Sequence, residues 1–235
     1  RAQAEAALRD PEPRVRVHAL QAAEAFLPES GRAILALGTD PDPRVQFQLA
    51  LTLGGMPGTE PLLAKIVARN PEDVWFRNAV LTCPPERALG LLRELVTAQR
   101  SFFAKTSRGK EEFIERLSMT AGALGDLEHI RGFVQLAATH PTLAATPWRV
   151  AVLKGIGSGL GPENRRGLPP GPTEPALVAM ARSNDREVSA AASNLVQYFQ
   201  LPDLVSGAMK VAGTPEQPID QRVQAIRLLR GGASE

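Results

Sequence analysis

The fold can be inferred from residues 40–54, which read Asp-Pro-Asp-Pro-Arg-Val-Gln-Phe-Gln-Leu-Ala-Leu-Thr-Leu-Gly. The same start occurs at residues 10–15 as Asp-Pro-Glu-Pro-Arg-Val and at residues 70–75 as Asn-Pro-Glu-Asp-Val-Trp. Each start precedes an apolar helical stretch, and the three starts are equally spaced along the chain. Looser versions follow at Ser183-Asn-Asp-Arg-Glu-Val188 and Gln217-Pro-Ile-Asp-Gln-Arg-Val223. Self-similarity of this kind indicates a repeat architecture.

The three strict starts have the chemistry of a helix N-terminus. We expect Asp10, Asp40 and Asn70 to cap the helices, because their side chains can accept hydrogen bonds from backbone N–H groups that have no helical partner. The proline that follows each of them would then be the first helical residue, where its missing N–H costs nothing. An acidic residue in the first turn is favoured by the helix dipole.

A further helix is expected before each capped one. Apolar residues recur at helical spacing, for example Leu62, Leu63, Ile66 and Val67. The expected ranges are Gly31–Leu37, Glu60–Arg69, Glu86–Thr97, Leu127–Thr139, Glu174–Arg182 and Pro202–Val211. The predicted fold is therefore all-α, a right-handed α-solenoid of about six to seven two-helix repeats that forms a single domain over residues 1–235.

The repeats resemble HEAT repeats, in particular those of phycobilisome-lyase-like proteins. That family has Asp at the turn, Val five residues later and then Arg, a pattern that Asp10, Val15 and Arg16 match. Gln46 and Phe76 stand at the corresponding later positions, so the Asp/Arg ladder that the resemblance implies is expected to be incomplete.

A second resemblance is to the HEAT region of exported multidomain proteins of planctomycete-type bacteria. The segments that carry it are Asp73-Val-Trp-Phe-Arg-Asn-Ala-Val-Leu and Val152-Leu-Lys-Gly-Ile-Gly-Ser-Gly-Leu. In those proteins a sorbosone-dehydrogenase-like propeller precedes the repeats and a c-type haem domain follows. The resemblance implies an exported or periplasmic middle piece of a longer chain; without it, a cytoplasmic location is expected. The mid-helix character of the first residues also suggests a processed chain or a fragment.

The composition favours short helices joined by tight turns. It gives no sign of the large positive charge that is typical of nucleic-acid-binding proteins. The chain has 235 residues, with 20 Gly and 20 Pro to punctuate its helices, and a formal net charge of only +2. Its single cysteine, Cys83, excludes an internal disulfide and a cysteine-based metal site. We expect Cys83 to be a small buried turn residue, and the three histidines to be structural or on the surface.

Two segments interrupt the repeat pattern, near residues 99–110 and 155–172. The first is basic and contains Phe102 and Phe103. These residues either contact an anionic partner or nucleic acid, by stacking of the rings, or fill the core while the cations face water. The second contains Gly-x-Gly-x-Gly, which we interpret as a helix end near Lys154 followed by an exposed loop, because no strand precedes it. Arg165 and Arg166 in that loop are candidates for contact with an acidic partner.

The leading functional hypothesis is a non-catalytic interaction scaffold or spacer, with no cofactor and no catalytic residues, that binds a protein partner or neighbouring domains. Two alternatives stay open: an accessory module that holds a haem- or tetrapyrrole-bearing partner, and a nucleic-acid-binding helical repeat. Trp75 and Trp148 are expected to fill the core at repeat junctions. Arginines near the helix starts would form a row that either grips a carboxylate-rich partner or staples neighbouring repeats: Arg14, Arg44, Arg77, Arg186 and Arg222.

Overall fold

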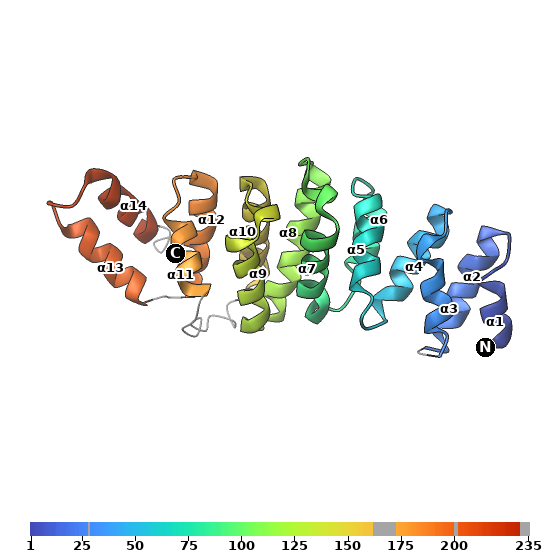
Figure 1. Cartoon of the computed structure of the whole chain (residues 1–235). Coiled ribbons are helices and arrows are strands. Elements are labelled where there is room, and N and C mark those ends of the chain that lie inside the picture. The colour runs from blue at the N-terminus through green and yellow to red at the C-terminus, as the bar shows by residue number, and fades with distance from the viewer. Residues whose placement is uncertain (28, 162–172, 200–201, 231–235) are drawn as a thin grey trace. The chain divides into compact units, whose positions relative to one another are not determined.

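The computed structural model describes residues 1–27, 29–161, 173–199 and 202–230 (Figure 1). Within these ranges the chain forms fourteen α-helices and no strand. The helices of residues 1–113 are α1 (Ala2–Ala7), α2 (Pro13–Glu24), α3 (Gly31–Leu35), α4 (Pro43–Gly54), α5 (Glu60–Arg69), α6 (Val74–Val80) and α7 (Ala88–Ala98). Those that follow are α8 (Arg108–Leu124), α9 (Leu127–Thr139), α10 (Thr146–Gly159), α11 (Thr173–Ala181), α12 (Arg186–Tyr198), α13 (Pro202–Gly213) and α14 (Ile219–Arg230).

Short 3₁₀ helices join some of these elements: η1 (Ala36–Thr39), η2 (Pro85–Arg87), η3 (Arg100–Phe103) and η4 (Pro141–Leu143). The described chain divides into two compact units, unit 1 with residues 1–113 and unit 2 with residues 114–235. The all-helical prediction is confirmed, and every expected first helix of a repeat is present with small differences at its ends.

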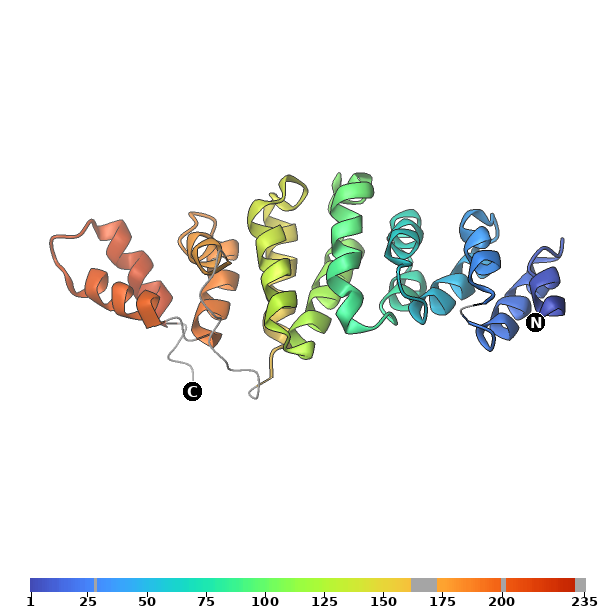
Figure 2. The ribbon, with the colours of Figure 1, turned by 60° about the horizontal axis from the view of Figure 1, so that its bottom comes forward.

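Consecutive helices form pairs in both units. Helix α1 packs on α2 and α5 packs on α6 in unit 1, while α9 packs on α10, α11 on α12 and α13 on α14 in unit 2. Figure 2 shows the α13–α14 pair in red from a second direction. Between neighbouring pairs, second helices pack on second helices and first helices pack on first helices. The second-helix contacts are α2 on α4, α4 on α6 and, in unit 2, α10 on α12. The first-helix contacts are α5 on α7 and, in unit 2, α9 on α11.

The third residue of the second helix faces the core in α4, α6, α10 and α12. Val45, Phe76, Trp148 and Val188 hold this position and are all buried. Val15, in the first pair, is 38% exposed. The prediction for Trp148 is confirmed, because its side chain is only 1% exposed.

The core prediction for Trp75 is wrong. Trp75 is 68% exposed, since it is the second residue of α6 and Phe76 takes the core position. The ring of Phe76 packs edge-on against Phe47, at 5.9 Å between ring centroids. Adjacent aromatic residues in a helix point in different directions, so only one of them can fill the core here.

The predicted capping residues are also wrong, by two or three positions. Helices α2, α4 and α6 are capped by Glu12, Asp42 and Asp73. Asp10 and Asp40 instead accept hydrogen bonds from the backbone N–H two residues later, at 2.8 and 2.9 Å. The tandem Asp-Pro pattern offers two possible helix starts, and the second one is used, with Pro13 or Pro43 as first helical residue.

The glycine-rich segment differs from its expected loop. Helix α10 continues through Gly155 and Gly157 to Gly159, five residues beyond the expected end at Lys154. A Cβ on Gly155 would lie 2.2 Å from the carbonyl oxygen of Glu115, and one on Gly159 would lie 2.1 Å from that of Met119. These glycines therefore let α10 pack backbone to backbone on α8. Residues 162–172 lie outside the described part of the chain.

Candidate interaction surface at the helix turns

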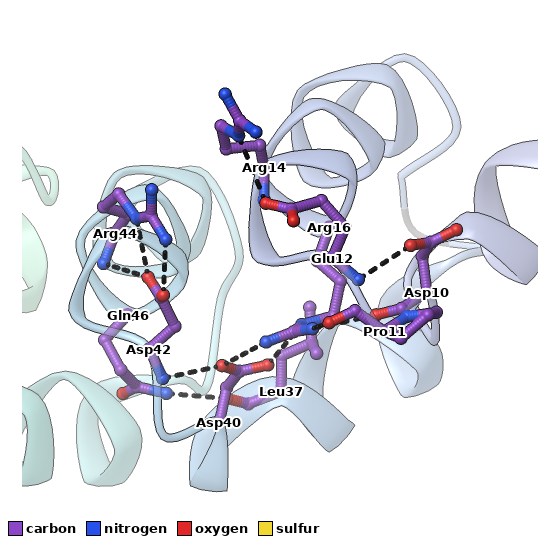
Figure 3. A network of polar contacts seen from close by, with 10 residues as sticks. All are labelled: Asp10, Pro11, Glu12, Arg14, Arg16, Leu37, Asp40, Asp42, Arg44 and Gln46. Carbon is purple, nitrogen blue, oxygen red and sulfur yellow. Dashed lines mark hydrogen bonds and ion pairs between the residues drawn. The ribbon is translucent and has the colours of Figure 1, made fainter.

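The turns that precede the second helices carry several of the charged contacts of unit 1. Figure 3 shows the two best-formed turns, at residues 10–16 and 40–46. Arg16 joins them: its Nε donates to Asp40 Oδ2 at 2.7 Å and its Nη2 donates to Asp40 Oδ1 at 3.0 Å. The same guanidinium donates to the carbonyl oxygens of Asp10 and Pro11 at 2.8 and 3.1 Å.

This contact is a nearly buried ion pair. The side chains of Arg16 and Asp40 are 11% and 5% exposed. Hydrogen bonding to Asp40 raises the pKa of Arg16 above its ordinary value, against the effect of burial. The pair stands where the HEAT resemblance implies a ladder contact between the first two repeats.

The ladder stops after this pair, at the position where the sequence lacks an arginine. Gln46 stands there instead, and its Nε2 donates to the carbonyl oxygen of Leu37 at 2.8 Å. Its Oε1 is buried and accepts no hydrogen bond from the described residues. The third turn is one residue longer than the first two, so Arg77 and not Phe76 occupies the ladder position of α6.

A contact that the sequence did not predict recurs at the fourth residue of the second helix. Its side chain donates to a backbone carbonyl at the end of the preceding helix or in the turn after it, groups that otherwise lack helical partners. The donors are Arg16, Gln46, Arg77, Arg149, Ser189 and Arg222, and the acceptors are the carbonyls of Asp10 and Pro11, Leu37, Pro71, Ala137, Ala181 and Ala212. Arginine, glutamine and serine share no obvious sequence signal except this fixed place in the helix.

The five predicted arginines occupy three different helix positions. Arg14 and Arg44 are second residues of their helices, Arg186 is a first residue, and Arg77 and Arg222 are fourth residues. Arg77 is buried, with its Nη2 3.8 Å from Glu112. The five side chains therefore do not share one register, because residues at different positions of a helical turn point in different directions.

Arg14 and Arg44 both pair within their own turn. Arg44 Nη2 lies 2.8 Å from Asp42 Oδ2, and Arg14 Nε lies 3.2 Å from Glu12 Oε1. Hydrogen bonds from the Arg44 guanidinium, and then from its backbone N–H, lower the pKa of Asp42 to about 2. Both arginines keep large exposed surfaces, but their charge is already matched by an adjacent carboxylate.

Phe102 and Phe103 belong to the core. Both rings are buried, and Phe102 packs edge-on against Phe103 and Phe113. Lys110 Nζ lies 5.5 Å from the centroid of the Phe102 ring. The two side chains are thus in the core arrangement and not in the stacking arrangement that binding a nucleic acid would need. Arg165 and Arg166 lie outside the described residues.

A hollow of about 1300 Å³ opens between α1 and α3. Its walls are apolar near the turns, where Leu8, Leu37 and four prolines contribute, and charged elsewhere through residues such as Arg9 and Arg32. Among the described residues, neither a histidine nor a cysteine lines this hollow.

The remaining reactive side chains have structural surroundings. Cys83 is buried, as predicted, and burial raises the pKa of its thiol. His140 accepts a hydrogen bond from the backbone N–H of Thr142, and His129 Nδ1 lies 3.4 Å from the capping carboxylate of Asp126. Within the described ranges, no three His, Cys, Asp or Glu side chains are grouped as a metal site would need.

No helix in the described part of the chain combines the length and apolar character required to span a membrane. No protein-family model matches the chain, and no curated protein matches its sequence.

Proposed function

We propose that this chain is a non-catalytic protein-interaction scaffold or spacer, built of HEAT-like repeats stacked as a right-handed α-solenoid. The observation that carries the proposal is the fourth-residue contact, which recurs in six second helices across both units. A contact that returns at a fixed helix position supports a repeated structural unit. Repeat proteins of this kind present extended surfaces for partners.

Each helix position in the repeat has a separate task, which leaves some positions open to a binding role. The third residue fills the core in α4, α6, α10 and α12, and the fourth satisfies backbone carbonyls in six second helices, as described above. The second residue is exposed in α2, α4 and α6, where it is Arg14, Arg44 and Trp75. Because these side chains are dispensable for packing, they can be selected for contact with a partner.

Two reactive or charged side chains, those of Cys83 and Arg77, are engaged in the fold. Cys83 has a raised thiol pKa and Arg77 is buried against the chain. A nucleophile needs a lowered pKa or an adjacent base, and burial of Cys83 works in the opposite direction. These environments favour a binding role over catalysis.

The proposal can be tested by titrating the whole chain against a panel of short fluorescent peptides that vary in charge and hydropathy. We expect saturable binding of a subset of the peptides, which are recovered chemically unchanged. The control is the chemically denatured chain, which carries the same residues without the packed helices. Turnover of a substrate by the purified chain, equal binding by the denatured chain, or no binding of any peptide would contradict the proposal.

A further inference from the structure

Trp75 and Val74 form an exposed apolar surface at the start of α6. Trp75 is 68% exposed and Val74 is 45% exposed. The indole is not needed for packing, because Phe76 already fills the core position of this turn. Exposed tryptophan is a frequent source of binding energy in protein interfaces, since it offers a large rigid apolar area.

The turn that precedes α8 contacts the turn that leads into α6, where this surface begins. Ser107 Oγ donates to Glu72 Oε1 at 2.6 Å, which ties the turn of residues 104–107 to the turn that precedes α6. Gly109 reinforces the contact, because a Cβ there would lie 2.6 Å from Arg77 Nη1 and 2.9 Å from Glu72 Oε2. The two turns are therefore held together by specific contacts within unit 1.

This neighbouring turn supplies two exposed cations. Lys105 and Arg108 are both exposed, and neither side chain forms an ion pair within the described part of the chain. They differ in this from Arg14 and Arg44, whose charges are matched in their own turns.

The acidic groups closest in the chain to Trp75 are already engaged. Glu72 accepts the hydrogen bond from Ser107, and Asp73 Oδ1 accepts from the backbone N–H of Trp75 at 2.8 Å as the cap of α6. Glu111 and Glu112, near the start of α8, are further acids of this region, and Glu112 lies 3.8 Å from Nη2 of Arg77. The surface therefore combines an apolar centre with two cations that are open to a carboxylate.

We infer that Val74, Trp75, Lys105 and Arg108, here called the tryptophan patch, bind a peptide segment that carries carboxylates beside an apolar side chain. The apolar side chain would cover the indole, and the carboxylates would pair with the ammonium and guanidinium groups. This inference rests on the proposed scaffold function and names the chemistry of one partner.

Single-stranded nucleic acid is the competing ligand, because it also uses cations and aromatic rings. Its binding needs several rings on which successive bases stack, together with a positively charged groove. Phe102 and Phe103, the other aromatic residues of this region, are buried. One exposed ring and two cations match a short peptide better.

The test uses the full chain and a fluorescein-labelled peptide in which Glu and Leu alternate. We expect saturable binding by anisotropy, weakened by ~tenfold or more in W75A and similarly in the K105E/R108E variant. Binding should also protect the protein from acrylamide quenching, because Trp148 is 1% exposed and the accessible emission comes from Trp75. The affinity should fall as salt rises.

Matched controls separate the patch from general effects. R93A removes an exposed cation of α7 to which no binding role is assigned, and it should leave the affinity unchanged. A peptide with Lys in place of Glu should bind more weakly, and W75A should keep the circular dichroism spectrum of the parent.

Equal binding of the Lys peptide, an unchanged affinity in W75A, or no binding of the Glu–Leu peptide would each overturn the inference. So would tighter binding of oligothymidine, which would assign the patch to nucleic acid. If other peptides in the panel bind and W75A does not affect them, the scaffold function stands and the assignment of this patch fails.

Discussion

Glycines in α10 determine how closely that helix approaches α8. Although they lie in one short segment, they differ in the space that is available for a Cβ atom. Gly155 and Gly159 face backbone carbonyl oxygens of α8 at distances that no Cβ could tolerate. A Cβ on Gly157, between them, would lie 3.6 Å from Leu195 Cδ2, which is an ordinary contact. The three positions therefore make a matched set for substitution.

We predict opposite effects on stability for alanine at these positions. G159A should destabilise the protein by about 2–3 kcal/mol, because the backbones of α8 and α10 must separate. G157A should be neutral or stabilising by up to about 1 kcal/mol, because alanine is the better helix former. Urea unfolding followed by circular dichroism measures both. Equal destabilisation by the two variants would contradict the close packing described for α10.

The Arg16–Asp40 pair allows a second prediction for single residues. R16M leaves the Asp40 carboxylate without its partner at a site that is 5% exposed, so we expect a loss of about 3 kcal/mol in the free energy of unfolding. R14A, two residues earlier, removes only an exposed pair and should change stability by less than about 0.5 kcal/mol. The comparison of unfolding midpoints decides whether the ladder contact stabilises the fold. Similar midpoints for R16M and R14A would show that it does not.

Among the secondary-structure elements, carboxylates at the helix starts make the helix ends sensitive to acid. Asp42, Asp126 and Asp185 cap α4, α9 and α12, and the pKa of each lies below its ordinary value. For Asp126 the largest cause is the backbone N–H of His129, and for Asp185 it is the hydroxyl of Thr146, which donates to the carboxylate from the start of α10. A depressed pKa means that the ionised form is favoured by folding.

The pH dependence follows from the sign of these shifts. Because the folded-state pKa of Asp42 is about 2 and its ordinary value is 3.8, its contribution is complete above 3.8 and is lost as the pH falls toward 2. We expect the unfolding midpoint to drop across this window, and the drop to be smaller in D42N, whose amide still caps the helix but does not titrate. Thermal melts between these pH values measure the effect. An identical slope in D42N would mean that Asp42 contributes no pH dependence.

Taken as a whole, the described chain divides into two compact units whose boundary falls within α8. The single-domain prediction for residues 1–235 stays a prediction, because compactness alone does not fix cooperativity. In repeat proteins each pair is stabilised by its neighbours, so destabilisation stays close to its origin. We therefore expect G159A to increase hydrogen exchange in α9–α12 while α2–α6 keep the parent's protection. A uniform increase along the chain would indicate one cooperative domain.

The proposed solenoid predicts a property of the whole chain in solution. A compact protein of 235 residues has a radius of gyration of about 18 Å. Stacked repeats are extended, so small-angle X-ray scattering should give a clearly larger radius and an elongated distance distribution. A value near that of a compact protein would argue against the solenoid.

Local patterns in the amino-acid sequence were sufficient to predict the helical class, the pairing of helices and the approximate ranges of the first helices. They were sufficient because apolar spacing and Asp-Pro starts act over a few residues, and Glu60–Arg69 and Leu127–Thr139 match their predicted ranges. Burial of Cys83 and Trp148 was predicted in the same way.

Which of two neighbouring residues plays each role depends on contacts between helices. Asp42 rather than Asp40 caps α4, Phe76 rather than Trp75 fills the core, and Gly159 ends a helix that was expected to stop earlier. The fourth-residue contacts and the tryptophan patch belong to the same class. Their partners lie on other helices, and a shift of one residue along a helix turns a side chain by about 100°, which a local pattern does not resolve.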